Sequence, residues 1–449
     1  MRQLFVCCTT YLATALAFVS VERPCLGAGN GHDASHEATK LNQRGLDYLH
    51  KKEYDQAVVT FRKALQIHPE DPDALDNLGR ALEATGKDAE AIAQFDRAIS
   101  IAPDKAISYA GKGLALFHEG QYEGAAASYR QAIEHHTNFS EAQNGLGASL
   151  LHLGKSDEAI AAFRASIASN PKNADALGNL GSALLAQNNA AEALPFLRKA
   201  YSLRPDWKDM LENYAAALEQ TGQTHEAIAA YHRLTRTHPD PALWAHLGSL
   251  YYRAKRYDQA VSAFDKSLAS KQDQPDVLLA LGQAQADLGK LSDAIGSYEK
   301  CVTLKPDEFH ALYRLGSAYY AQKDYARAAA NYEKASALKP EYADSIIGLG
   351  ASQLAGSKFE EAVATYQKLV PLRPDDADVR FNLGNALFNA GKFQEAAGTY
   401  REAVRLNPDL AHAHYNLGTA LLRLNDATSA QTEFAEAHRL DPSLNPPTR

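Results

Sequence analysis

The chain has 449 residues, a formal net charge of −8 at neutral pH and a hydrophobic content of 45%. This charge is mild for the length and no run of Lys and Arg occurs, so non-specific nucleic-acid binding is not expected. Only four cysteines are present, Cys7, Cys8, Cys25 and Cys301, which excludes a disulfide framework.

The first 28 residues differ from the rest of the chain. A short basic start at Arg2 precedes an uncharged, mostly apolar stretch over residues 4–21, which is typical of a secretory signal. Cleavage is expected after Ala17 or near residues 27–28. The alternative is an uncleaved membrane anchor over residues 4–21, since about 18 apolar residues can just span a bilayer. Residues 29–37 are expected to form a flexible linker.

From residue 38 to residue 442 the sequence repeats every 34 residues. Alanine marks one slot of each unit, and one interval alone differs, the 33 residues between Ala227 and Ala260. The alanines are Ala57, Ala91, Ala125, Ala159, Ala193, Ala227, Ala260, Ala294, Ala328, Ala362, Ala396 and Ala430. A fixed period of this length predicts an array of stacked units, so we expect one elongated domain rather than several globular ones.

Each unit carries two helical patterns separated by a turn. In the second unit Leu75, Leu78 and Leu82 follow helical spacing, and Phe95 and Ile99 do so after the turn. The turn slot holds Gly in six units and Asn188 or Asn425 in two others, as a left-handed helix end requires. A glycine lies twelve residues before the alanine in all units but one. The small size of this residue allows two helices to approach each other closely.

This spacing resembles the tetratricopeptide repeat, in which Gly, Ala, an aromatic residue and Pro recur over 34 residues. The resemblance covers about residues 38–442 as twelve repeats, and residues 443–449 are expected to form a C-terminal tail. One departure is that Trp244 alone fills the Trp slot. The resemblance implies an all-α fold, a right-handed superhelical solenoid of antiparallel helix pairs with a concave ligand groove.

The sequence predicts no catalytic site, cofactor or metal. Gly154-Lys155-Ser156 looks like the end of a phosphate-binding loop, but the first glycine of that motif and the preceding strand are missing. His32 and His36 could hold a metal weakly, although a solvated linker explains them as well. We therefore expect a protein that is not an enzyme.

One polar slot, two residues before the glycine, commonly faces the concave side in this family. It holds Asn77, Asn179, Asn213, Asn382 and Asn416. In some long arrays, notably that of O-linked N-acetylglucosamine transferase, such asparagines hold a peptide backbone. An amide can donate to a carbonyl and accept from an N–H, so the row is a candidate peptide-binding ladder. The alternative is that Asn is simply the consensus residue there.

Aromatic residues are concentrated in the C-terminal half of the expected concave wall. They are Tyr252, Tyr313, Tyr320, Phe381, Phe388 and Tyr415. Aromatic anchors often carry interface energy, so these residues predict a docking site for a partner segment. The alternative is that they pack between helices.

An acidic row lies where the first helix of many units begins. Its members are Asp73, Glu141, Asp175, Asp209, Asp276, Asp344 and Asp378. The row is either a strip for a basic ligand or a set of residues that stabilise helix N-termini. At the two ends of the array, Arg44 and the pair Gln431 and His438 replace apolar residues, as expected of polar terminal repeats.

The expected function is an exported scaffold, periplasmic or secreted, that binds peptide segments or partner proteins. The alternative is an accessory subunit of an envelope enzyme complex, such as a glycosyltransferase or a polymer synthesis or secretion machinery. Self-association is a third hypothesis. Contact with a membrane is expected only through an uncleaved leader. A chaperone adaptor of the carboxylate-clamp type is disfavoured, because Asp76, Ala110 and Glu212 stand where Lys and Asn are needed.

Overall fold

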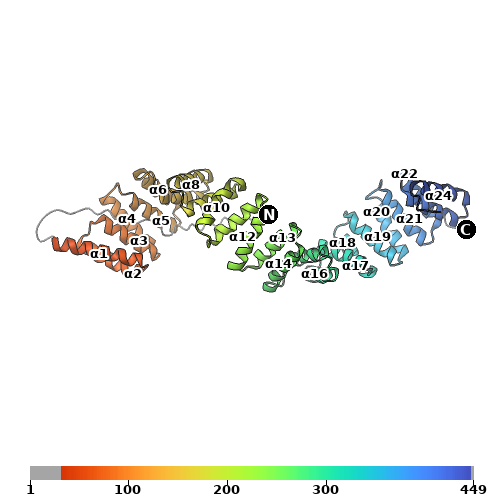
Figure 1. Ribbon diagram of the computed structural model, residues 1–449, viewed down its shortest axis with the longest axis horizontal. Helices are drawn as coiled ribbons and strands as arrows, with labels where there is room; N and C mark the ends of the chain where they lie inside the picture. Colours follow the sequence, from red (N-terminus) through yellow and green to blue (C-terminus); the bar gives the residue numbers. More distant parts are fainter. Residues whose placement is uncertain (1–31, 446–449) are drawn as a thin grey trace. The chain divides into compact units, whose positions relative to one another are not determined.

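The computed structural model describes residues 32–445, and over this range the chain forms 24 α-helices and no strand. Helices follow one another in pairs joined by a short turn, and the second helix of each pair packs back against the first (Figure 1). We call the odd-numbered helices first helices and the even-numbered ones second helices. The all-α repeat fold expected from the sequence is confirmed.

The helices have the following bounds. They are α1 (His32–His50), α2 (Tyr54–Ile67), α3 (Pro72–Ala84), α4 (Asp88–Ile101), α5 (Ala106–His118), α6 (Tyr122–His135), α7 (Ser140–His152), α8 (Ser156–Ser169), α9 (Ala174–Ala186), α10 (Ala190–Leu203), α11 (Lys208–Gln220), α12 (Thr224–Thr237), α13 (Pro241–Arg253), α14 (Tyr257–Ser270), α15 (Pro275–Asp287), α16 (Leu291–Leu304), α17 (Phe309–Ala321), α18 (Tyr325–Leu338), α19 (Ala343–Ala355), α20 (Phe359–Leu369), α21 (Ala377–Asn389), α22 (Phe393–Leu406), α23 (Ala411–Arg423) and α24 (Ala427–Leu440).

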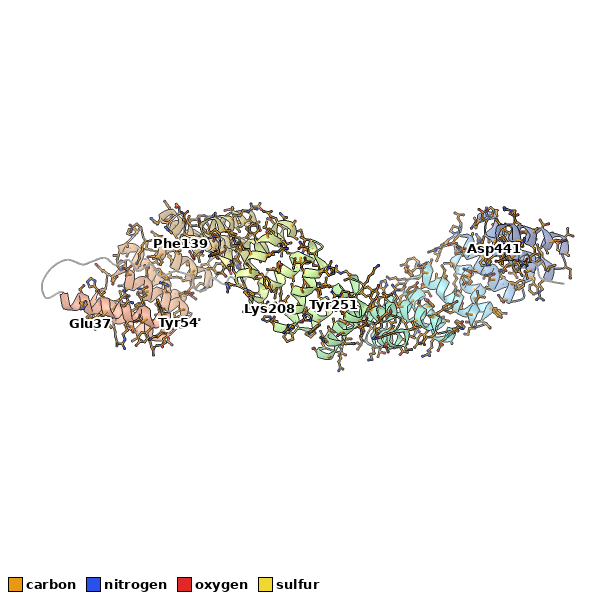
Figure 2. All side chains as sticks on the ribbon, in the orientation of Figure 1. Glu37, Tyr54, Phe139, Lys208, Tyr251 and Asp441 are labelled. Carbon is orange, nitrogen blue, oxygen red and sulfur yellow. The ribbon has the colours of Figure 1, made fainter. Side chains whose placement is uncertain are left out.

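The chain divides into two compact units, residues 1–238 and residues 239–449. The described part of the first unit holds α1 to α12, and that of the second holds α13 to α24. The division falls within the short interval between Ala227 and Ala260. Figure 2 shows the side chains along both units, with Tyr54 at the start of α2 and Tyr251 near the end of α13.

Within each unit, most neighbouring first helices touch one another. Helix α3 contacts α5 and helix α15 contacts α17, whereas neighbouring second helices make no comparable contact in the described residues. In a curved stack, the helices that lie closer together are on the inner side. Here these are the first helices. Within a unit, the inner face is therefore made of first helices.

The twelve repeat alanines are fully buried, each with 0% of its surface exposed. They lie in second helices, one turn before the aromatic residue of the same helix, or before Leu197 in α10. The glycine of the first helix faces that ring: a Cβ on Gly79 would lie 2.8 Å from Phe95 Cε1. The small slots therefore set the distance between paired helices, as expected from their spacing.

The turns between paired helices have the left-handed backbone that the sequence predicted. The turn glycines have φ between 71° and 82°, and Asn188 and Asn425 have φ of 59° and 61°. In four other repeats Lys52, Lys255, Lys323 and Ser357 adopt the same conformation without glycine.

One boundary differs from the sequence expectations. Helix α1 begins at His32, so residues 32–37 are helical rather than part of a flexible linker over residues 29–37. This stretch contains no Gly or Pro, and Ala38 is packed with 3% exposure, so the helix continues backwards from the repeat. Helix α20 ends at Leu369, because Pro371 cannot donate the next backbone hydrogen bond.

None of the helices between residues 32 and 445 combines the length and the apolar character needed to cross a bilayer. The expected signal or anchor over residues 1–28 lies outside the described residues, as do residues 446–449 of the expected tail.

Candidate functional site

The predicted asparagine row lies on first helices, and its side chains are half-buried. Four of the five donate a hydrogen bond from Nδ2 to a polar side chain on the preceding first helix. Asn77 donates to Asn42 at 3.1 Å and Asn179 donates to Asn144 at 3.0 Å. The amides thus connect successive first helices across the repeat boundary.

The other two connections use a second acceptor position, 31 residues earlier. Asn213 donates to Ser182 Oγ at 2.7 Å, and Asn416 donates to Asn385 Oδ1 at 2.8 Å. The hydroxyl of Tyr400 also donates to Asn385 at 2.8 Å. Asn382 lies in the same slot on α21, half-buried, but shows no such connection within the described part of the chain.

The predicted aromatic residues separate into two groups. Tyr313, Phe381 and Tyr415 pack against a ring on the second helix of the same repeat. The ring centroids are 5.7 Å apart for Tyr313 and Tyr332, 6.1 Å for Phe381 and Tyr400, and 5.3 Å for Tyr415 and Phe434. These three side chains therefore hold the two helices of a repeat together, in addition to any contact with a partner.

Tyr252, Tyr320 and Phe388 lie in the last turn of a first helix. Each meets the first residue of the following second helix, five positions later, and we call these two residues an edge pair. The centroid distances are 5.6 Å for Tyr252 and Tyr257, 5.5 Å for Tyr320 and Tyr325, and 5.2 Å for Phe388 and Phe393. Tyr320 is 40% exposed, so this ring is accessible to a partner.

The edge pairs extend beyond the residues that the sequence analysis selected. In the first unit Phe117 and Tyr122 form one at 5.2 Å, and His152, the last residue of the next first helix, stacks on Tyr122 at 4.3 Å. The second member of each pair was missed because only first-helix slots were compared. The 34-residue period was the signal that could have found it.

The hydroxyl of Tyr252 is hydrogen-bonded within the protein. It donates to Asp287 on α15. Burial, followed by the hydrogen bond and the charge of Asp287, raises the pKa of Tyr252 to about 12. The single O–H of this phenol is therefore engaged with Asp287.

The acidic row lies in the first turns of first helices, where negative charge favours the helix N-terminus. Three members also pair with cations. Lys105 lies 2.7 Å from Asp73 and Arg373 lies 3.3 Å from Asp344, while Arg204 pairs with Asp175. These contacts favour the structural interpretation of the row.

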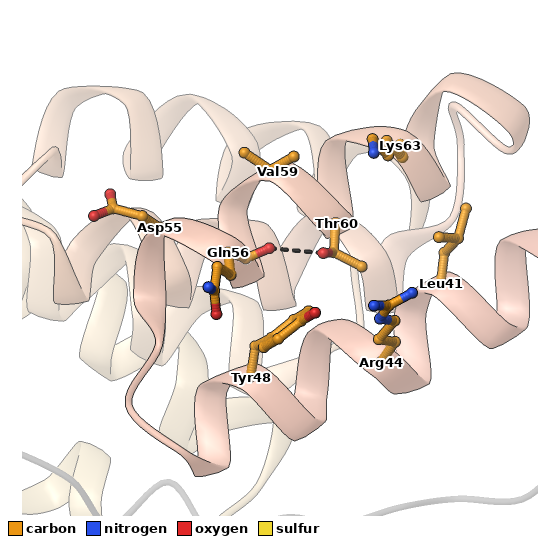
Figure 3. A pocket seen from close by; sticks show the side chains of 8 residues that line it. All are labelled: Leu41, Arg44, Tyr48, Asp55, Gln56, Val59, Thr60 and Lys63. Atoms are coloured by element: carbon orange, nitrogen blue, oxygen red, sulfur yellow. Dashed lines mark hydrogen bonds between the residues drawn. The ribbon is translucent and has the colours of Figure 1, made fainter.

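A shallow hollow of about 350 Å³ lies on the first repeat and is lined by side chains of both α1 and α2 (Figure 3). Val59, 53% exposed, lies in it, and the Arg44 guanidinium lies 5.7 Å from the Tyr48 ring centroid. The hollow is the surface on which a preceding repeat would pack. We assign it no ligand.

His414 and His135 make contacts within the protein. His414 lies 2.6 Å from Glu433 and 3.0 Å from the carbonyl oxygen of Pro408, and His135 stacks on Tyr109 at 5.3 Å. Cys301 is a buried free thiol, and burial raises its pKa to about 11. Another cluster that the sequence analysis did not select, Glu83, Asp88 and His118, has metal-ligand chemistry and is treated below.

These features define a helical repeat protein with a continuous face of first helices in each unit. Models of the tetratricopeptide repeat match residues 36–104, 110–169, 144–208, 215–275, 279–343, 313–377, 347–411 and 381–445. The chain belongs to the tetratricopeptide repeat family. No curated protein sequence matches it significantly.

Several solved structures are similar to parts of the chain. PilF of Pseudomonas aeruginosa is 20% identical, with a TM-score of 0.43, over 46% of this chain and 94% of PilF. YrrB, described as a TPR protein with an unusual peptide-binding site, is 24% identical, with a TM-score of 0.37, over 40% of this chain and 94% of YrrB. A thermophilic TPR protein of Thermus thermophilus is 22% identical, with a TM-score of 0.36, over 40% of this chain and 98% of its own. We draw no functional argument from these similarities.

Proposed function

We propose that the protein is a non-catalytic scaffold that binds peptide segments or partner proteins on the inner face of its first helices. Proteins of the tetratricopeptide repeat family generally act as interaction scaffolds, binding peptides or proteins. The observation that carries the finer proposal is the asparagine row, because its amides are held in place by bonds between successive first helices.

Such an arrangement suits an extended peptide. An amide that donates one N–H to the neighbouring helix retains a second N–H and its Oδ1 acceptor. Side chains that are already ordered lose less entropy on binding than mobile ones. Regularly placed amides can therefore bind peptide backbone without reading its sequence.

The edge pairs of the second unit supply apolar contact area on first helices. Tyr320 is exposed, so the second unit offers an accessible ring surface. We place the docking of a partner segment in the second unit, on Tyr252, Tyr320 and Phe388.

Affinity capture from the envelope fraction of the native cells tests this proposal. The full chain serves as bait and is compared with the triple variant Y252A/Y320A/F388A. The matched control is L304A/L338A, which removes two apolar side chains, 43% and 44% exposed, from second helices of the same unit. We expect mass spectrometry to find at least a tenfold loss of the specific partner with the triple variant and none with the control.

Equal recovery of that partner by all three baits would contradict the docking site. Replacing Tyr313, Phe381 and Tyr415 with alanine is a weaker test of the docking site, because these rings pack on second helices. Truncating them would lower stability as well as affinity.

We infer further that the protein is exported, on the composition of residues 4–21. N-terminal sequencing of the protein from its native cells tests this inference. A start at residue 18 or near residue 29 is expected, and a retained leader would contradict cleavage.

A further inference from the structure

Edge pairs are contacts between two aromatic rings in several repeats. Four repeats fill both positions with aromatic rings at centroid distances of 5.2 to 5.6 Å. They are Phe117 with Tyr122, Tyr252 with Tyr257, Tyr320 with Tyr325, and Phe388 with Phe393. The last residue of the next first helix, such as His152, covers the pair from the side.

The second repeat places two carboxylates in this position. Glu83 in the last turn of α3 and Asp88 at the start of α4 occupy the slots of Phe117 and Tyr122. Their side chains are only 22% and 17% exposed. His118, the last residue of α5, takes the covering position that His152 takes one repeat later.

The three side chains converge on one point. His118 Nδ1 lies 3.3 Å from Glu83 Oε1 and 3.5 Å from Asp88 Oδ1, and the three ligand atoms lie within 4.8 Å of one another. This cluster cannot be recognised in the sequence, because its members come from three helices of two repeats.

The charges of the cluster are incompletely compensated by the protein. Burial raises the pKa of Glu83; His118 and Arg80 oppose this rise, whereas Asp88 adds to it. Among residues 32–445, Asp88 Oδ1 is buried without a hydrogen-bond partner, and its 3.5 Å separation from His118 is too long for a good one. The buried hydroxyl of Tyr129 also lacks a partner, and burial, followed by the Glu83 charge, raises the pKa of this phenol.

The donor atoms and their spacing match a first-row divalent metal ion. With bonds of about 2.0–2.2 Å and tetrahedral angles, ligand atoms lie about 3.3–3.6 Å apart. The two N···O separations of 3.3 and 3.5 Å fall in this range. An imidazole nitrogen with two carboxylates suits Zn²⁺ or a similar ion, whereas Ca²⁺ and Mg²⁺ prefer oxygen ligands alone.

We propose that Glu83, Asp88 and His118 bind a divalent transition-metal ion of the zinc type. The ion joins the ends of α3 and α5 to the start of α4, and water completes its coordination. It supplies the positive charge that two half-buried carboxylates need, and in doing so fastens the second repeat to the third.

Zinc titration of the metal-free, untagged full chain tests this proposal, with a chromophoric chelator as competitor. The double variant E83F/D88Y copies the aromatic edge pair of the next repeat and should fold, which far-UV circular dichroism checks. H118A removes the third ligand, and H152A changes the same slot one repeat later as the matched control.

Wild type and H152A are expected to bind one Zn²⁺ more per chain than E83F/D88Y, and H118A to bind it at least tenfold more weakly than wild type. Zinc should raise the melting temperature of wild type and H152A by several degrees more than that of E83F/D88Y. Equal stoichiometry, affinity and melting shift in wild type and folded E83F/D88Y would overturn the proposal, as would tighter binding of Mg²⁺ than of Zn²⁺.

Discussion

Asp76 on α3 is a carboxylate with 3% of its residue surface exposed. Its cationic partner is Lys105, which also binds Asp73. Burial raises the pKa of Asp76, and the charge and hydrogen bond of Lys105 only partly oppose this effect. Burial lowers the pKa of Lys105, but its two carboxylate partners outweigh that effect and raise it. Burial in the folded state therefore disfavours the ionised form of Asp76 but not that of Lys105.

This imbalance predicts a pH dependence of stability. Because folding raises the pKa of Asp76, its ionised form lowers stability at neutral pH, and protonation relieves that cost as the pH falls towards the ordinary value of 3.8. We expect the unfolding free energy of wild type minus that of D76N to increase as the pH falls from 8 to 4, measured by urea unfolding.

The exposed Asp104, next to Lys105 in sequence, provides the control variant D104N. A difference between wild type and D76N that stays constant over this pH range would show that burial does not dominate at Asp76. The same trend with D104N would point to a general charge effect instead.

At the scale of the element, the turn between paired helices depends on one residue with positive φ. Gly86 has φ of 71°, and a Cβ there would meet nothing within 4 Å, so the turn needs glycine for its backbone conformation alone. Ser357 and Lys323 adopt φ of 60° and 63° at the same slot. The repeat tolerates this strain because the helices on both sides are held by packing.

Opposite effects are therefore expected from two glycine substitutions. G86A should lower the unfolding free energy by about 1 kcal/mol, because alanine is strained in the left-handed region. G398A, inside α22 with nothing within 4 Å of the added Cβ, should raise it by about 0.5–1 kcal/mol through helix propensity. Denaturant unfolding measures both, and a loss of stability in G398A equal to that in G86A would contradict the account.

The helices and turns could be predicted from the sequence because they depend on local periodicity. The asparagine and aromatic slots were also identifiable, and their role in binding remains a prediction. Their contacts within the protein were not predictable, since Asn213 bonds to Ser182 and Tyr313 packs on Tyr332 only after neighbouring helices pack. The start of α1 at His32 was not predicted, because it depends on weak local signals.

At the scale of the whole molecule, the core consists of local clusters that follow one another along each unit. One cluster spans Ala57 to Ala115 and another spans Ala343 to Phe434. In such an array each repeat is stabilised by its neighbours rather than by one central core. A partner bound across several first helices would add contacts to several repeats at once.

The sequence led us to expect one elongated domain, and the structure divides the chain into residues 1–238 and 239–449. The division lies at the single short interval of the repeat, where Asp240 caps α13 by accepting from Ala242 N at 2.6 Å. The aromatic docking residues all belong to the second unit, whereas the asparagine row has three members in the first unit and two in the second.

Site-specific photo-crosslinking in the native cells tests the central claim most directly. A photoreactive phenylalanine analogue replaces either Tyr320 on first helix α17 or Leu338 on second helix α18, which are 40% and 44% exposed. Our account predicts a crosslinked partner from position 320 and none from position 338. Crosslinks from position 338 alone, or equally from both positions, would contradict binding on the face of the first helices.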